Sequence, residues 1–205
     1  HVYTQQVEVE GITRITPEDV AYAEDCDSVM KLIGWVKRNF EENTIVIRVC
    51  PALLSTDSQL ASVDDVFNGI LVRGDITWDV MFYGKGAGKL PTASAVVADV
   101  IEEVKNPENI ATMYWEDAPE HYVVDAKTAE ISYYVRARVL DAKRAVEVAK
   151  EMFGEIAVLS RKGQPEDEIA FLTPELEERA LDDTLAKFQS IADATLLGLI
   201  RRLNY

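Results

Sequence analysis

The stretch Glu130-Ile-Ser-Tyr-Tyr-Val-Arg-Ala-Arg-Val-Leu140 decides the fold expected for the second half of the chain. Apolar side chains alternate there with more polar neighbours, at Ile131, Tyr133, Val135, Ala137 and Val139. Successive side chains of a β-strand point to opposite faces, so this period of two predicts a strand that is exposed on one face.

The elements after this strand predict a ferredoxin-like plait. Apolar residues recur at helical spacing over 145–153. Two short strands are expected over 155–160 and 168–173. A helix is expected from Thr173-Pro174 onward, and a last strand over 194–200. The order βαββαβ predicts an antiparallel sheet with two helices on one face, a fold that does not by itself say what it binds.

The first half of the chain predicts strand pairs flanked by helices. Residues 16–19, Thr-Pro-Glu-Asp, form a helix start with a capping box. Apolar and β-branched runs predict two strand pairs, over 29–36 with 44–49 and over 66–72 with 78–83. Helical spacing of valines and isoleucines predicts a longer helix from about Thr92. The predicted fold class is therefore α+β, with a mixed α/β portion followed by the plait.

Composition excludes several classes of function. The 205 residues carry 21 Lys and Arg against 36 Asp and Glu, a net charge of −15, so nucleic acid and anionic membrane surfaces are poor partners. No apolar run approaches the roughly 20 residues of a membrane span. Cys26 and Cys50 are expected as buried thiols in a reducing cytosol, which predicts a cytoplasmic protein. His1 and His121 lie far from both cysteines in the sequence, so no metal site is expected.

A glycine-rich turn, Gly84-Lys-Gly-Ala-Gly-Lys-Leu-Pro-Thr92, follows the second strand pair. Glycines let backbone N–H groups approach a phosphate, and a helix N-terminus adds partial positive charge. The spacing matches neither the P-loop nor the dinucleotide fingerprint. Two interpretations stay open, an anion-binding turn and a tight structural turn in which Pro91 opens a helix. Lys85 and Lys89 either attract a phosphate or are solvated surface lysines.

Several stretches resemble homoserine dehydrogenase of the bacterial and archaeal type. They are residues 8–15, 29–32, 60–63 with 66–70 and, as the most specific match, 84–96. The C-terminal plait looks like the ACT regulatory domain that many members carry. The resemblance divides the chain into a catalytic-domain portion, a linker and an ACT-like domain, over 1–112, 113–130 and 131–205.

The resemblance implies an NAD(P)-dependent oxidoreductase that interconverts L-aspartate 4-semialdehyde and L-homoserine in threonine and methionine biosynthesis. In the family, the turn at Gly86, Ala87 and Gly88 lies against the nicotinamide cofactor, so these are the expected cofactor-binding residues. The family's GxGxxG domain, its substrate-binding acids and its catalytic Asp and Lys lie upstream of the segment that resembles 8–15. The chain is therefore interpreted as a C-terminal piece of the enzyme that is inactive alone and binds no cofactor tightly.

The resemblance also implies a homodimer and, in the complete enzyme, a small-molecule substrate and a threonine effector. The strands over 130–140 and 194–200 are expected to be sheet edges that need pairing, which favours a dimer. The turn over 141–144 lacks the Pro-Gly pair that is common in ACT domains, so a plait that dimerises without sensing stays open.

The alternative class is a non-enzymatic amino-acid-binding or dimerisation module. Several scattered carboxylates are expected to be solvated, at Glu8, Glu10, Asp57, Asp64 and Asp65.

Overall fold

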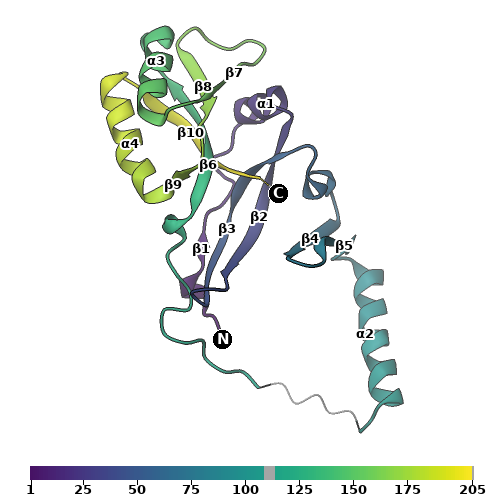
Figure 1. The fold of residues 1–205 in the computed structure, drawn as a ribbon. Coiled ribbons are helices and arrows are strands. Elements are labelled where there is room, and N and C mark those ends of the chain that lie inside the picture. Colours follow the sequence, from purple (N-terminus) through teal and green to yellow (C-terminus); the bar gives the residue numbers. More distant parts are fainter. Residues whose placement is uncertain (109–113, 205) are drawn as a thin grey trace. The chain divides into compact units, whose positions relative to one another are not determined.

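The computed structural model describes residues 1–108 and 114–204. Its backbone divides into two compact units, one formed by His1–Thr56 with Asp117–Tyr205 and the other by Asp57–Glu116. Among the described residues, the first unit holds an eight-stranded mixed sheet and the second a two-stranded sheet, so the fold is mixed α/β (Figure 1). The boundaries of these units differ from the division at 112 and 130 that the resemblance implies. That division concerns a catalytic and an ACT-like portion, and it stays a prediction.

The first unit begins with helix α1 and a long hairpin. Two short elements, η1 (Thr4–Gln6) and β1 (Glu8–Val9), precede α1 (Pro17–Asp25). The backbone N–H of Thr16 donates to the Asp19 carboxylate at 2.9 Å, so the predicted capping box is present. Strands β2 (Ser28–Asn39) and β3 (Thr44–Ser55) then pair in antiparallel register, which confirms the first predicted strand pair and lengthens both strands.

The second half of the chain contains the predicted strands and helices in the predicted order. They are β6 (Glu130–Arg138), α3 (Ala142–Phe153), β7 (Ala157–Leu159), β8 (Glu168–Leu172), α4 (Glu178–Ile191) and β10 (Thr195–Leu203). Two short elements, η3 (Ala126–Thr128) and β9 (Leu176–Glu177), were not predicted. Without the two-residue β9 the order is βαββαβ, and the strands lie side by side as β10-β6-β8-β7 with all neighbours antiparallel.

This sheet does not end at the strands that the sequence predicted as edges. Strand β10 lies between β6 and β3, and its residues Arg201–Leu203 pair in parallel with Ala52–Leu54. Strand β6 lies between β10 and β8. The expectation of an open edge was therefore wrong for 130–140, because β6 has a strand on each side. For 194–200 it is correct in the described part of the chain, because β3 pairs only with Arg201–Leu203 and leaves Thr195–Ile200 without a strand on that side.

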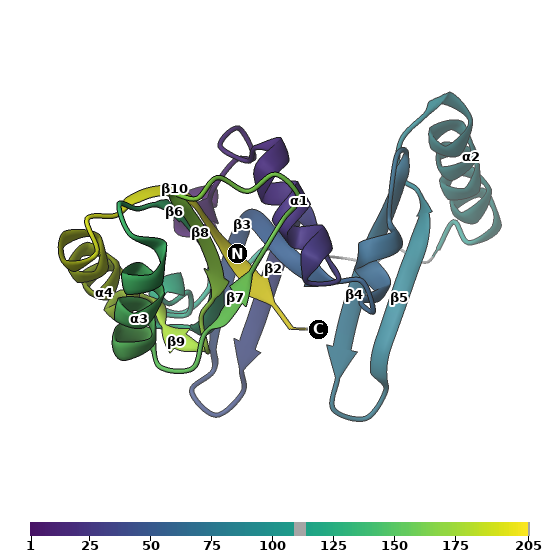
Figure 2. The same cartoon turned by 90° about the horizontal axis from the view of Figure 1, so that it is seen from above.

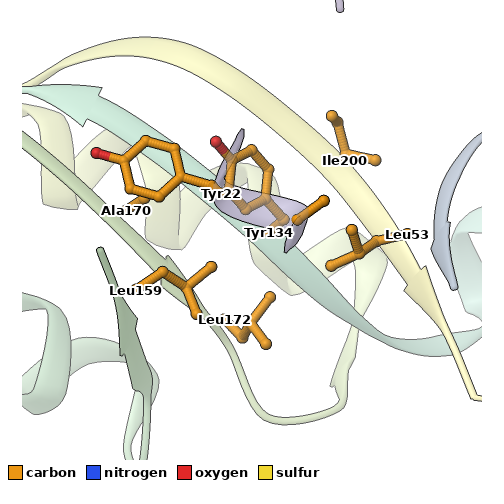
Figure 3. Packing of buried hydrophobic residues seen from close by; sticks show 8 residues of the cluster. Tyr22, Leu53, Tyr134, Leu159, Ala170, Leu172 and Ile200 are labelled. Atoms are coloured by element: carbon orange, nitrogen blue, oxygen red, sulfur yellow. The ribbon is translucent and has the colours of Figure 1, made fainter. Parts of the chain in front are cut away.

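The expectation of a half-exposed strand over 130–140 was also wrong, because β6 is buried on both faces from Ile131 to Ala137. Helices α3 and α4 lie on one side of the sheet and α1 lies on the other (Figure 2). Tyr22 of α1 packs in one cluster with Tyr134 of β6 (Figure 3). The Tyr134 hydroxyl donates to Asp19 at 3.0 Å. The period-two pattern reflects only the alternation of apolar and more polar residues along the strand. It cannot show that a distant helix covers the more polar face.

The start of α4 also differs from the prediction. The sequence pattern Thr173-Pro174 predicts an N-cap, but the helix begins at Glu178. The Thr173 hydroxyl instead accepts the backbone N–H of Tyr133 at 3.0 Å, and the Thr173 carbonyl accepts the Ser132 hydroxyl at 2.6 Å. Thr173 is therefore held against β6, and the chain adds β9 before it turns into the helix.

The second unit is small and has little core. It contains η2 (Gln59–Ser62), the hairpin of β4 (Phe67–Gly74) and β5 (Trp78–Lys85), and the helix α2 (Lys89–Lys105). The hairpin confirms the second predicted strand pair. No described residue of α2 is buried. Large apolar side chains are exposed on the hairpin and on the helix, among them Ile70, Trp78, Phe82, Val96, Val100 and Val104.

Candidate functional site

The candidate cofactor site is the turn between β5 and α2. Strand β5 ends at Lys85 and α2 begins at Lys89, so Gly86, Ala87 and Gly88 form the connection. The predicted helix start near Thr92 was one turn too late. Proline is tolerated within the first helical turn because the N–H that it lacks would have no intrahelical acceptor.

Gly88 is required by its backbone conformation. It is the N-cap residue of α2, with φ of 123° and ψ of 155°, a region that L side chains rarely adopt. Gly86 is constrained by space instead, because a Cβ there would collide with the side-chain amide of Asn68. Gly84 has neither constraint, since a Cβ at that position would meet no atom within 4 Å.

The N-terminus of α2 is open to an anion. No side chain caps it, and its first turn contains no acidic residue. Thr92 closes the first helical hydrogen bond by donating its N–H to the Gly88 carbonyl at 3.1 Å. The N–H groups of the first turn have no intrahelical acceptor and carry the positive end of the helix dipole. Although the chain carries a net charge of −15, the local backbone donors of this turn suit a phosphate or another anionic group.

Of the two lysines that flank the turn, Lys85 already has an aromatic neighbour. Its ammonium lies 5.6 Å from the ring centroid of Phe67. That ring stacks on Tyr83 with centroids 4.8 Å apart. A cation over an aromatic face is attracted by the ring, so Lys85 is held along the hairpin at this turn.

The turn after β6, over 141–144, is closed by a helix cap. The Asp141 carboxylate accepts the backbone N–H of Arg144 at 3.1 Å and caps α3. The Asp141 side chain thus satisfies a backbone N–H at the start of α3, so this N–H is less available to a ligand.

A second set of polar residues was missed at the level of sequence. Glu8 and Glu10, expected as solvated carboxylates, contact arginines that are almost completely buried. The Arg48 guanidinium lies 2.6 Å from Glu8 and 2.7 Å from Glu178, and that of Arg201 lies 2.6 Å from Glu10 and 2.6 Å from Glu178. The available signal was the presence of arginines inside apolar strands, since buried charges occur in pairs.

Within residues 1–108 and 114–204, no group of three or more His, Cys, Asp or Glu side chains is arranged to hold a metal ion. Cys26 is half-buried and Cys50 is buried, and neither forms a disulfide. Burial raises the pKa of the Cys50 thiol. In the same part of the chain, no helix has the length and apolar character needed to cross a membrane.

The fold and the turn define a mixed α/β protein with a helix start suited to an anionic cofactor. The family model of homoserine dehydrogenase matches residues 1–101, a segment that includes the turn. The homoserine dehydrogenase of Synechocystis is 47% identical over 105 residues, which is 50% of this chain and 24% of that protein. The enzyme of Pseudomonas aeruginosa is 28% identical over 197 residues, covering 89% of this chain and 45% of its own length.

The solved structures agree with the sequence comparisons. A homoserine dehydrogenase from Thiobacillus denitrificans superposes with a TM-score of 0.76 at 28% identity, over 98% of this chain and 48% of that one. The chain thus spans about half the length of the relatives that it matches along most of its own length. It belongs to the homoserine dehydrogenase family.

Proposed function

We propose that this chain supplies the C-terminal portion of a homoserine dehydrogenase, and that the turn at Gly86, Ala87 and Gly88 forms one wall of the NAD(P) site. The observation that carries the proposal is the uncapped helix start after Gly88, within the segment matched by the family model. The complete enzyme interconverts L-aspartate 4-semialdehyde and L-homoserine in threonine and methionine biosynthesis. NAD(P) supplies the hydride acceptor or donor when bound.

The residues of this chain bind and position the cofactor in this proposal. The positive φ of Gly88 turns the backbone so that α2 presents its free N–H groups, and the absence of a side chain leaves room for close approach. In the same proposal, the catalytic Asp and Lys, the substrate-binding acids and the GxGxxG domain lie upstream of this chain, as the family resemblance implies. The chain alone therefore has no catalytic activity, and a single wall binds the cofactor weakly.

We propose further that residues 131–205 form an ACT-type domain. The order βαββαβ and the strand order β10-β6-β8-β7 support this assignment. The Asp141 cap favours a structural role over binding of threonine at the adjoining turn. A cytoplasmic location is part of the same proposal and is supported by the two free thiols.

We also propose that the complete enzyme is a homodimer, as the resemblance implies. The sheet-edge argument for dimerisation is weakened, because β6 is an interior strand and Arg201–Leu203 of β10 pair with β3. The exposed apolar face of the β4–β5 hairpin now supports the proposal. Ile70 and Phe82 are directly opposite in register and are 64% and 63% exposed, which is typical of a surface that another protein covers.

The test of the cofactor site compares two glycines in a complete enzyme that contains this chain. Gly88→Ala forces a side chain into a positive φ and should raise the KM for the cofactor about tenfold or more, with a smaller change in the KM for homoserine. Gly84→Ala is the matched control, because its Cβ meets open space. Steady-state kinetics in both directions give the constants, and circular dichroism checks the fold.

Equal cofactor constants for both variants would overturn the assignment of the turn. The chain of residues 1–205 alone is the negative control in the same assay. Homoserine-dependent reduction of NAD(P) by that chain would contradict the placement of the catalytic residues upstream.

A further inference from the structure

A cavity of about 440 Å³ lies where two strands share one edge of β3. Strand β1 pairs with β3 in parallel at Arg48 and Val49, and β10 pairs with β3 in parallel at Ala52–Leu54. The cavity is lined by Glu10 and Gly11, which follow β1, by residues 196–201 of β10, and by Pro51 of β3. Cavities of this size are typical of small-molecule sites.

The cavity faces an unpaired part of a sheet edge. Strand β10 pairs with β3 only at its last three residues, so over Thr195–Ile200 it has no strand neighbour on that side in the described part of the chain. Residues Leu196–Ile200 line the cavity. A strand edge presents alternating N–H and C=O groups, which a ligand can use for hydrogen bonds.

Charged side chains line the cavity, with more carboxylates than bases in the lining, while Arg48 and Arg136 pair with three of those carboxylates from outside it. The acids are Glu8, Glu10, Asp19, Glu178 and Asp182, and the bases are Arg14, Lys127 and Arg201. The buried Arg201 is already held by Glu10 and Glu178 at 2.6 Å each, so its charge is not available to an added anion. Arg14 and Lys127 are on the exposed rim, where they pair with Glu10 and Asp182.

Glu8 and Glu10 retain capacity to accept hydrogen bonds. One Glu8 oxygen accepts two bonds from Arg48, while the other is 3.5 Å from Arg201. Each carboxylate oxygen has two lone pairs, so both side chains accept more donors than the arginines supply. An added ammonium group would place its N–H donors against the lone pairs that the arginines leave unused.

We propose that this cavity binds a small organic ammonium ion, whose ammonium group lies against Glu8 and Glu10 and whose second polar group bonds to the open edge of β10. Apolar atoms of the ligand would lie between them, against Ile15, Leu181 and Leu199. The wall combines residues 8–19, which lie in the family-matched segment, with residues 127–201, which lie beyond it. The site therefore requires both halves of the first compact unit and is independent of the glycine-rich turn.

The test uses three linear probes that share a terminal hydroxyl and differ at the other end, namely aminobutanol, butanediol and hydroxybutyrate. Each is titrated into the full chain while amide resonances are followed by NMR. Gly11 and Gly198 both line the cavity and give separate reporters on its two sides. We expect saturable shifts at both glycines with aminobutanol, in the millimolar range, and at least about tenfold weaker binding of the other two probes.

Variants separate the charge of the site from its shape. Glu8→Gln and Glu10→Gln should each weaken aminobutanol binding about tenfold. Asp182→Asn tests the rim of the cavity without changing a partner of the buried arginines, and it should weaken aminobutanol binding less than the two glutamate variants do. Glu147→Gln on the exposed face of α3 is the matched control. If the Glu10 variant fails to fold, the probe series and the Glu8 and Asp182 variants still decide the question. The proposal is overturned if neither glycine shifts, if the diol or the carboxylate binds as well as the amine, or if no acidic variant differs from the control.

Discussion

At the residue scale, Glu178 shows how the protein stabilises a charge in its interior. Its side chain is 5% exposed and contacts Arg48 at 2.7 Å and Arg201 at 2.6 Å. Burial by itself raises the pKa of this carboxyl, but hydrogen bonds and positive charge from Arg201 and Arg48 outweigh it, so the pKa is lowered overall. The ionised form is therefore more favourable in the folded protein than in the unfolded chain.

This shift predicts how stability depends on pH. A lowered pKa contributes stability above the unfolded value of 4.5, and the contribution disappears as the pH falls through 4.5 toward the folded value. Glu178→Gln should lower the free energy of unfolding by about 3 kcal/mol at pH 7, because it leaves two buried arginines underpaired. Below pH 4.5, the stability of the variant should also decline less steeply than that of the parent.

Urea unfolding from neutral to acidic pH measures both effects, with Glu147→Gln as the exposed control. Parallel stability curves for the Glu178 variant and the parent would contradict the ion-pair account.

At the element scale, Thr173 decides where the last helix begins. Its hydroxyl satisfies the buried N–H of Tyr133, and that bond holds the segment before α4 against β6. Thr173→Val keeps the volume but leaves the N–H without an acceptor. It should lower the free energy of unfolding by about 1–3 kcal/mol. Thr184→Val is the control, since that hydroxyl bonds only to the Ala180 carbonyl within α4. Equal costs for the two substitutions, measured by denaturant unfolding, would show that Thr173 has no special role.

Local signals predicted most of the elements, because helix starts, strand periodicity and turns depend on neighbouring residues. The capping box at Thr16 and both hairpins of the first half are examples. The candidate turn was located in the same way, since closely spaced glycines between a strand and a helix have a local meaning. The positive φ of Gly88 gives that pattern its physical reason.

Features that depend on distant segments were not predictable from a local pattern. The burial of β6 on its second face depends on α1, whose Tyr22 is more than a hundred positions away in the chain. The roles of Glu8 and Glu10 depend on Arg48 and Arg201, which no sequence spacing connects. Nor does a local pattern show which neighbour a strand pairs with, so the pairing of Arg201–Leu203 with β3 was not predicted.

At the scale of the whole molecule, the N-terminal segment and the plait form one structure. The plait pairs with β3 through Arg201–Leu203, and its second face packs against α1. The Arg136 guanidinium lies 3.0 Å from Asp19, and Tyr22 donates to Glu168 at 3.0 Å. Each of these contacts joins residues before position 56 to residues after position 117, so the apolar and charged interior is shared.

This shared interior predicts that residues 117–205 will not fold cooperatively on their own. Removing the first segment exposes Tyr134, Leu172 and Ile200 to water, and it leaves Glu168 without Tyr22 and Glu178 without Arg48. Buried side chains of this size contribute about 1.5–3 kcal/mol each, so the loss from these three is comparable to the whole stability of about 5–15 kcal/mol that is typical of a domain. Joining residues 1–56 to 117–205 through a flexible Gly-Ser linker should restore a single sharp thermal transition, because this is the first compact unit. Calorimetry and near-UV circular dichroism of the two shortened chains, beside the full chain, make the comparison. A sharp transition and dispersed amide resonances from residues 117–205 alone would show that the plait is an autonomous domain, and that the contacts with α1 and β3 only attach it.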